Sequence, residues 1–106
     1  MPLSWVYLLV AGMLEIGFTT FLKLTEGFTK PIMTGFFLLF SFLSFYCLNK
    51  SLESIPLGVA YAVWTGIGAA GTACVGVFIF GDDLSLWKAF FLFTLVGSIF
   101  GLKALS

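Results

Sequence analysis

The chain has 106 residues, of which 60% are hydrophobic and only 9% are charged, and its mean hydropathy is +1.14. This ratio of apolar to charged residues lies far outside that of soluble domains and predicts a membrane protein. Five lysines balance five acidic residues and no histidine is present, which argues against a nucleic-acid interface, a histidine-based catalytic triad and a metal site.

The remaining chemistry is equally sparse. Cys47 and Cys74 lie in different apolar segments and at no metal-ligand spacing, so we expect no disulfide framework. No pair of nucleophile and base can be assembled from the apolar segments. The sequence therefore predicts a protein that is not an enzyme and that uses neither a metal nor another cofactor.

Four apolar segments are long enough to cross a bilayer as helices, since about 20 helical residues span a hydrocarbon core of roughly 30 Å. They are residues 3–22, 31–49, 55–80 and 86–105. Their connections are too short for a soluble domain. We expect a single all-α transmembrane domain over residues 1–106, with the first segment retained as a span because it lacks the basic start of a signal peptide.

The first segment carries an acid in its interior, within the stretch VAGMLEIGFTT. At a rise of about 1.5 Å per residue, Glu15 lies within a few Å of the midplane. A charge at this depth is costly unless it faces a polar cavity or a partner, which indicates a functional residue. The alternative is a protonated acid with only a structural role. On the same helix face, Gly12 is expected to open space, Phe18 lies one turn away, and Thr19 adds a hydroxyl.

An acid in such a place holds a proton or a cationic ligand, but not readily both. This competition is the minimum chemistry of proton-coupled antiport. Ser44, in the second segment, could order Glu15 from a neighbouring helix. Its alternative partner is the backbone carbonyl four residues earlier in its own helix.

The third segment contains the stretch AYAVWTGIGAAG. Tyr61 and Trp64 share a helix face, where the tyrosine hydroxyl can donate to a carboxylate and the rings suit delocalised cations. Simple helix packing is the alternative for Tyr61, whereas Trp64 lies too deep for an interfacial belt. Gly66, Gly68 and Gly71 predict either a bend, which would serve alternating access, or close helix packing.

The last segment places Gly97 and Gly101 at a spacing that lets two helix backbones approach closely, so we expect a dimer contact there. Four short helices also enclose too little volume to shield a charged ligand from lipid. Association therefore looks necessary from the sequence alone.

The lysines indicate how the chain is oriented, because basic loops set topology. Lys50 and Lys103 lie on one side with the N-terminal amine, and Lys23, Lys30 and Lys88 lie on the other. The two sides are nearly balanced. The chain could insert both ways and pair as an antiparallel dimer, unless features outside this rule fix one orientation.

Taken together, the motifs resemble the small multidrug resistance family along the whole chain. The resemblance rests on AGMLEIG around Glu15, LKLTEGFTK, IPLGVAYAVWTGIGAAG and the terminal GLK. It implies an antiparallel, dual-topology dimer of four-helix subunits in the bacterial inner membrane, exchanging protons for a cation at paired glutamates. WTGIGA, GLK and Ser44 are most similar to the guanidinium-exporting branch.

One position departs from that branch, in which tryptophan usually stands at the place of Phe18. Phenylalanine lacks the ring N–H of tryptophan, which leaves two alternatives. The site could be looser and accept quaternary ammonium or aromatic cations, or the chain could form a heterodimer whose partner supplies the N–H donor. Two other functions stay open as alternatives: an accessory membrane subunit that transports nothing, and a cation channel.

Overall fold

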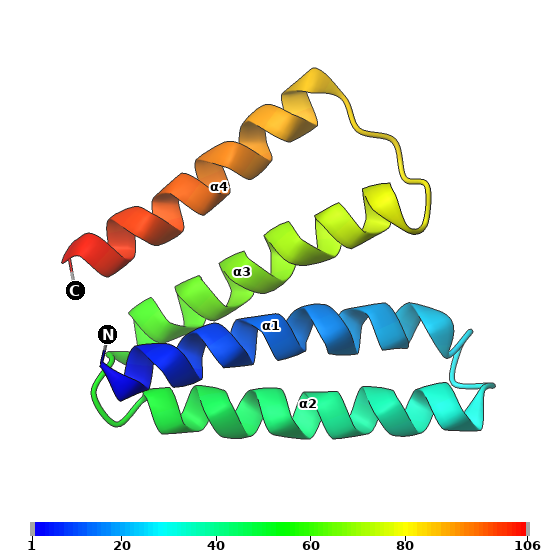
Figure 1. Ribbon diagram of the computed structural model, residues 1–106, viewed down its shortest axis with the longest axis horizontal. Coiled ribbons are helices and arrows are strands. Elements are labelled where there is room, and N and C mark those ends of the chain that lie inside the picture. Colours follow the sequence, from blue (N-terminus) through cyan, green and yellow to red (C-terminus); the bar gives the residue numbers. More distant parts are fainter. Residues whose placement is uncertain (1, 106) are drawn as a thin grey trace.

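The computed structural model describes residues 2–105, most of which lie in four α-helices (Figure 1). The helices are α1 (Leu3–Leu24), α2 (Pro31–Ser51), α3 (Leu57–Phe78) and α4 (Leu86–Leu105). Their bounds agree with the four predicted segments to within two residues at every end. Each helix is long and apolar enough to cross a membrane. The chain is an all-α, multi-pass membrane protein, as its composition predicts.

Two prolines help to set where helices begin. Pro31 is the first residue of α2, and Pro56 directly precedes the first residue of α3. The first N–H groups of a helix have no intrahelical partner, so proline sacrifices no hydrogen bond at these places.

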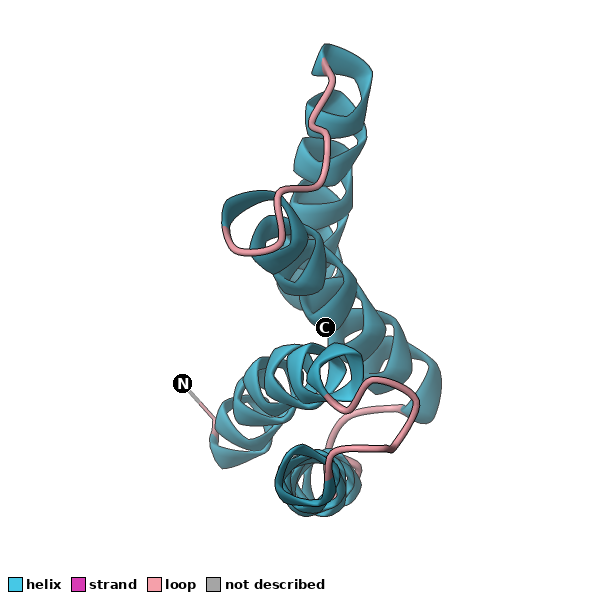
Figure 2. Ribbon diagram, turned by 90° about the vertical axis from the view of Figure 1, so that its right-hand side faces the viewer, coloured by secondary structure: helices cyan, strands magenta, loops and turns pink. Residues whose placement is uncertain are grey.

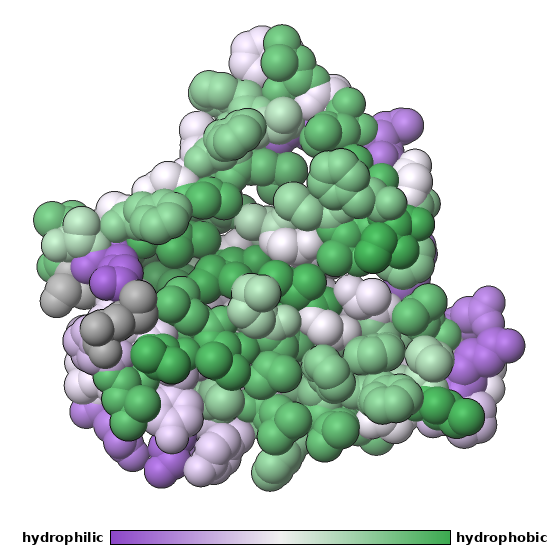
Figure 3. Space-filling model, viewed as in Figure 1, coloured by the Kyte–Doolittle hydropathy of each residue, from purple (hydrophilic) through white to green (hydrophobic). Residues whose placement is uncertain are grey.

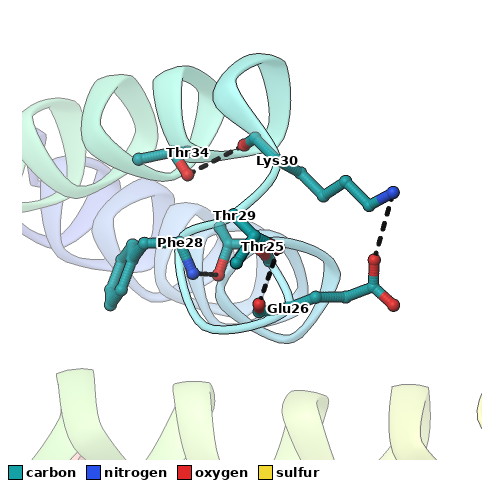
Figure 4. A network of polar contacts seen from close by, with 6 residues as sticks. All are labelled: Thr25, Glu26, Phe28, Thr29, Lys30 and Thr34. Atoms are coloured by element: carbon teal, nitrogen blue, oxygen red, sulfur yellow. Dashed lines mark hydrogen bonds and ion pairs between the residues drawn. The ribbon is translucent and has the colours of Figure 1, made fainter.

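A buried threonine organises the turn between α1 and α2 (Figure 4). Thr25 Oγ1 donates to a carbonyl of the last turn of α1 at 2.7 Å and accepts the N–H of Phe28 at 3.2 Å. The carbonyl of Thr25 also accepts the N–H groups of Thr29 and Lys30. Residues 26–28 all have positive φ, a conformation that side chains other than glycine rarely adopt. These hydrogen bonds stabilise that conformation, and α2 returns alongside α1.

α4 packs against only one of the other three helices. α1 packs along α2 on one side and against α3 on the other, while α4 extends along α3 only (Figures 1 and 2). Within residues 2–105, the α4 backbone does not approach α1 or α2, and no residue of α4 is buried. Most of the surface of α4 is consequently open to lipid or to another protein.

The buried core is small and lies mainly in the first halves of α1 and α3. Its members are Trp5, Leu8, Ala11, Ile55, Ala60, Val63 and Trp64. The visible face of the molecule is apolar across its middle, and its hydrophilic side chains gather toward the ends of the helices (Figure 3). This distribution suits a bilayer, because lipid tails surround the apolar middle of the molecule and the hydrophilic ends reach water.

Candidate functional site

Glu15 lies on the face of α1 that packs against α3. Its carboxyl group touches the backbone at Gly68, where a Cβ atom would overlap the Cδ and Oε1 atoms of Glu15. The Oε1 atom is buried and has no hydrogen-bond partner within residues 2–105. Buried side-chain oxygens nearly always have such a partner, so Oε1 is a free acceptor for a ligand or a proton.

Three helices are joined by hydrogen bonds one turn away from this carboxyl group. The fully buried Ser44 Oγ of α2 donates to the carbonyl of Ala11 on α1 at 2.7 Å and accepts the Nε1–H of Trp64 on α3 at 3.0 Å. The hydroxyl thus bonds neither to Glu15 nor to the carbonyl four residues earlier in its own helix, the two partners that the sequence suggested. Ser44 thus bonds to the backbone of α1 one turn before Glu15 rather than to Glu15 itself.

The two aromatic residues of α3 have different surroundings. Trp64 is only 6% exposed, and its ring centre lies 5.2 Å from that of Phe45 and 5.8 Å from that of Tyr61. This placement agrees with the expectation that Trp64 is no interfacial residue. Tyr61 is 56% exposed, and its hydroxyl forms no hydrogen bond with Glu15 in the described part of the chain. Tyr61 therefore faces outward from the single subunit.

Two predicted neighbours of Glu15 serve helix packing instead. Gly12 opens no space, because the Ile67 side chain fills it: a Cβ at residue 12 would lie 2.7 Å from Ile67 Cγ2. Phe18 faces α2, with its ring centre 6.1 Å from that of Phe37. The expectation of open space beside Glu15 at Gly12 was wrong, because it could not include a side chain from α3.

Thr19 forms a contact that the sequence analysis missed. Its Oγ1 lies 2.6 Å from Thr72 Oγ1 on α3 and also donates to the carbonyl of Ile16 at 3.0 Å. A signal was present, because Thr72 follows Gly68 by four residues as Thr19 follows Glu15, and residues four apart share a helix face. This spacing predicts the contact between Thr19 and Thr72 only once the contact between Glu15 and Gly68 is known.

The glycines of α3 are points of close packing. A Cβ at Gly66 would lie 2.8 Å from Ile99 Cδ1 of α4, Gly68 meets Glu15, and Gly71 contacts the side chain of Ile16. The helix is unbroken through this region. Of the two expectations for these glycines, the structure supports close packing.

The small-residue seam of α4 faces away from the rest of the subunit. Gly97 and Gly101 are exposed, and a Cβ at either would meet no other described atom within 4 Å. The predicted dimer contact thus lies on a free surface and stays a prediction.

The site combines a carboxyl group, a free buried oxygen and no fixed countercharge. The ion pairs of the described residues are far from Glu15 in the sequence: Glu26 pairs with Lys30 in the first connection, and Glu53 pairs with Lys50 of the last turn of α2. Without a lysine partner, Glu15 needs a proton or a mobile cation to neutralise it in the membrane.

These features define a small membrane protein of four apolar helices with one acid inside its spans. Residues 3–95 match the family model described as Small Multidrug Resistance protein. The chain belongs to the small multidrug resistance family.

Similar curated proteins cover almost the entire chain. The chain is 39% identical to a protein of Proteus vulgaris named "Guanidinium exporter", over 98% of this chain and 100% of that protein. A protein of the same name from Citrobacter freundii is 39% identical over 95% and 96% of the two chains. Another, from Yersinia pseudotuberculosis, is 38% identical over 98% and 100%.

Proposed function

We propose that the protein is a proton-coupled antiporter that exports guanidinium or small substituted guanidinium cations. The observation that carries the proposal is the buried Oε1 of Glu15, which has no partner in the described chain although it lies inside a membrane span. The names of the full-length relatives support the choice of cation.

Guanidinium suits such a carboxyl group chemically. A guanidinium group is planar and presents N–H donors in forks that match a carboxylate with two parallel hydrogen bonds. Gly68 and Ile67 pack closely around the first helix near Glu15, which favours a small planar ion over a bulky one. No metal or other cofactor is needed for this exchange.

A functional unit of two oppositely oriented subunits in the bacterial inner membrane completes the proposal. The exposed α4 with Gly97 and Gly101 supplies a surface for the contact, and the balanced lysines permit both orientations. In such a unit, the exposed Tyr61 would face the partner, and the two copies of Glu15 would share one cation.

Exchange follows from competition at Glu15. When Glu15 is ionised it binds the cation, and when it takes a proton the charge that holds the cation disappears. Lowering the pH should therefore weaken guanidinium binding, and raising the pH should strengthen it until Glu15 is fully ionised.

Equilibrium binding of guanidinium to the purified protein over a range of pH tests this proposal. We expect the affinity to fall with decreasing pH and to vanish in Glu15→Gln, which keeps the side-chain volume but cannot ionise. Glu53→Gln is the matched control, because Glu53 is exposed, lies in the connection after α2 and pairs with Lys50. Binding by Glu15→Gln equal to wild type would refute the proposal, and binding of tetrapropylammonium but not guanidinium would favour a multidrug exporter.

A further inference from the structure

The contacts between α1 and α3 repeat along the two helices. Glu15 meets Gly68, and one turn later Thr19 meets Thr72. The two helices run in the same direction (Figure 1), so the next positions on these faces are Lys23 and Gly76. A line of polar side chains thus leads from Glu15 toward the C-terminal ends of α1 and α3.

A small cavity lies at the far end of this line. Its volume is about 120 Å³, and its lining consists of Thr19, Thr20, Lys23, Thr72, Val75, Gly76, Phe80 and Asp82. At about 30 Å³ for each water molecule, it has room for a few of them. The cavity holds one ammonium group and one carboxylate, so it has no net negative charge that would collect guanidinium.

The two threonine hydroxyls stand between this cavity and Glu15. The hydroxyls of Thr20 and Thr65 donate to carbonyls of their own helices, as do those of Ser41 and Thr94. The Thr72 hydroxyl instead meets Thr19 across the helix interface. With the two oxygens 2.6 Å apart, no gap is left for a cation, but each hydroxyl can accept one proton while it donates another.

We propose that Thr19 and Thr72 form a proton path between this cavity and Glu15, separate from the route of the cation. Water in the cavity gives a proton to Thr72 Oγ1, and the original Thr72 proton moves to Thr19 Oγ1. At rest the Thr19 hydroxyl donates to the carbonyl of Ile16, so it must first rotate away from that carbonyl. Its original proton then reaches the Glu15 carboxylate through a bridging water. Each hydroxyl gains one proton and loses one, so one proton is moved, and the reverse sequence releases it.

This inference rests on the proposed antiport and adds that the proton has its own path. Two assays on proteoliposomes separate the two claims. The first measures proton movement driven by a guanidinium gradient, and the second measures exchange of labelled for unlabelled guanidinium, which needs no proton transfer. Thr72→Val removes the hydroxyl but keeps the shape of the side chain. Thr94→Val is the control, because the Thr94 hydroxyl bonds within its own helix on α4.

We expect Thr72→Val to slow coupled proton movement by about a hundredfold or more, the lower end of what positioned proton-transfer groups contribute, and to leave guanidinium self-exchange unchanged. Thr19→Val should give the same result, and Thr72→Ser should restore coupling. If the valine variants couple protons as well as wild type does, or lose both activities alike, the proton path is refuted. If wild type performs guanidinium self-exchange but moves no protons, or performs neither, the proposed antiport fails first.

Discussion

Glu15 stands apart from the other acidic residues because it lies within a membrane span, where no ion pair of the described chain neutralises it. Asp82 and Asp83 form no ion pair within residues 2–105 either, but they lie in the connection between α3 and α4. Glu26 and Glu53 lie in the connections and pair with lysines at helix ends, where water screens them and the pairs contribute little. Glu15 packs instead against the backbone of Gly68, with one oxygen unpartnered. A carboxyl group in this state is costly to the fold, and a ligand that completes its hydrogen bonds removes part of that cost.

The Ser44 hydroxyl offers a test of how the surroundings position Glu15. Ser44→Ala should lower the free energy of unfolding by about 1–3 kcal/mol, because it leaves the buried Trp64 N–H without an acceptor. Guanidinium binding should weaken as the backbone at Ala11 loses its tie to α2.

Ser41→Ala is the matched control for this change. Ser41 lies one turn earlier in α2, but its hydroxyl donates to the carbonyl of Phe37 in the same helix. Its removal should change the free energy of unfolding by no more than about 0.5 kcal/mol. Denaturant unfolding in detergent and equilibrium binding measure the two effects. Equal effects of the two substitutions would mean that the Ser44 network has no special role.

Sequence reasoning at this scale could find Glu15 but not its neighbours. An acid inside an apolar span is conspicuous because of its cost alone. The partners of Ser44 and Thr19 depend on which faces of the helices meet. α2 carries phenylalanines and leucines on several sides, many of them exposed, so its sequence does not indicate which face packs against α1. The filling of the space at Gly12 by Ile67 could not be predicted for the same reason.

At the scale of helices, close packing of α1 on α3 depends on glycine at residue 68. Gly68→Ala should displace the Glu15 carboxyl group, because the added methyl group would overlap it. The methyl group is fixed to the α3 backbone and cannot move aside, so the free energy of unfolding should fall by about 1–3 kcal/mol. Guanidinium transport should be lost or strongly reduced. Radiolabelled uptake into proteoliposomes measures the transport.

Gly58→Ala is the control, since it lies on the same helix with nothing within 4 Å of the added methyl group. It should stabilise α3 by up to about 1 kcal/mol through helix propensity and leave transport intact. Transport by Gly68→Ala at the wild-type rate would show that Glu15 does not need this contact.

The bounds of the helices could be predicted because bilayer thickness fixes their length and because Pro31 and Pro56 mark two beginnings. Composition gives no information on how far α4 lies from α1 and α2, since all four helices are similarly apolar. The choice between a bend and close packing at the glycines of α3 likewise required the positions of Ile16 and Ile99.

At the scale of the whole molecule, the distribution of the lysines predicts how the chain is oriented in the membrane. Because the lysines are nearly balanced on the two sides, reporters fused to the C-terminus should show both topologies in one population of wild-type protein. Added lysines in the connection at Lys50 should fix one orientation and impair transport. A matched variant with glutamines added at the same place should keep both orientations. Wild-type protein in one orientation only would exclude a homodimer of inverted copies.

The central claim is that Glu15 exchanges guanidinium for protons in a protein made of this chain alone. Proteoliposomes containing only this chain and a pH-sensitive dye test it most directly, when an outward guanidinium gradient is imposed. We expect guanidinium efflux to drive protons inward in wild type and in Glu53→Gln, and to drive none in Glu15→Gln. Proton movement in Glu15→Gln, or guanidinium efflux without proton movement in wild type, would contradict the account.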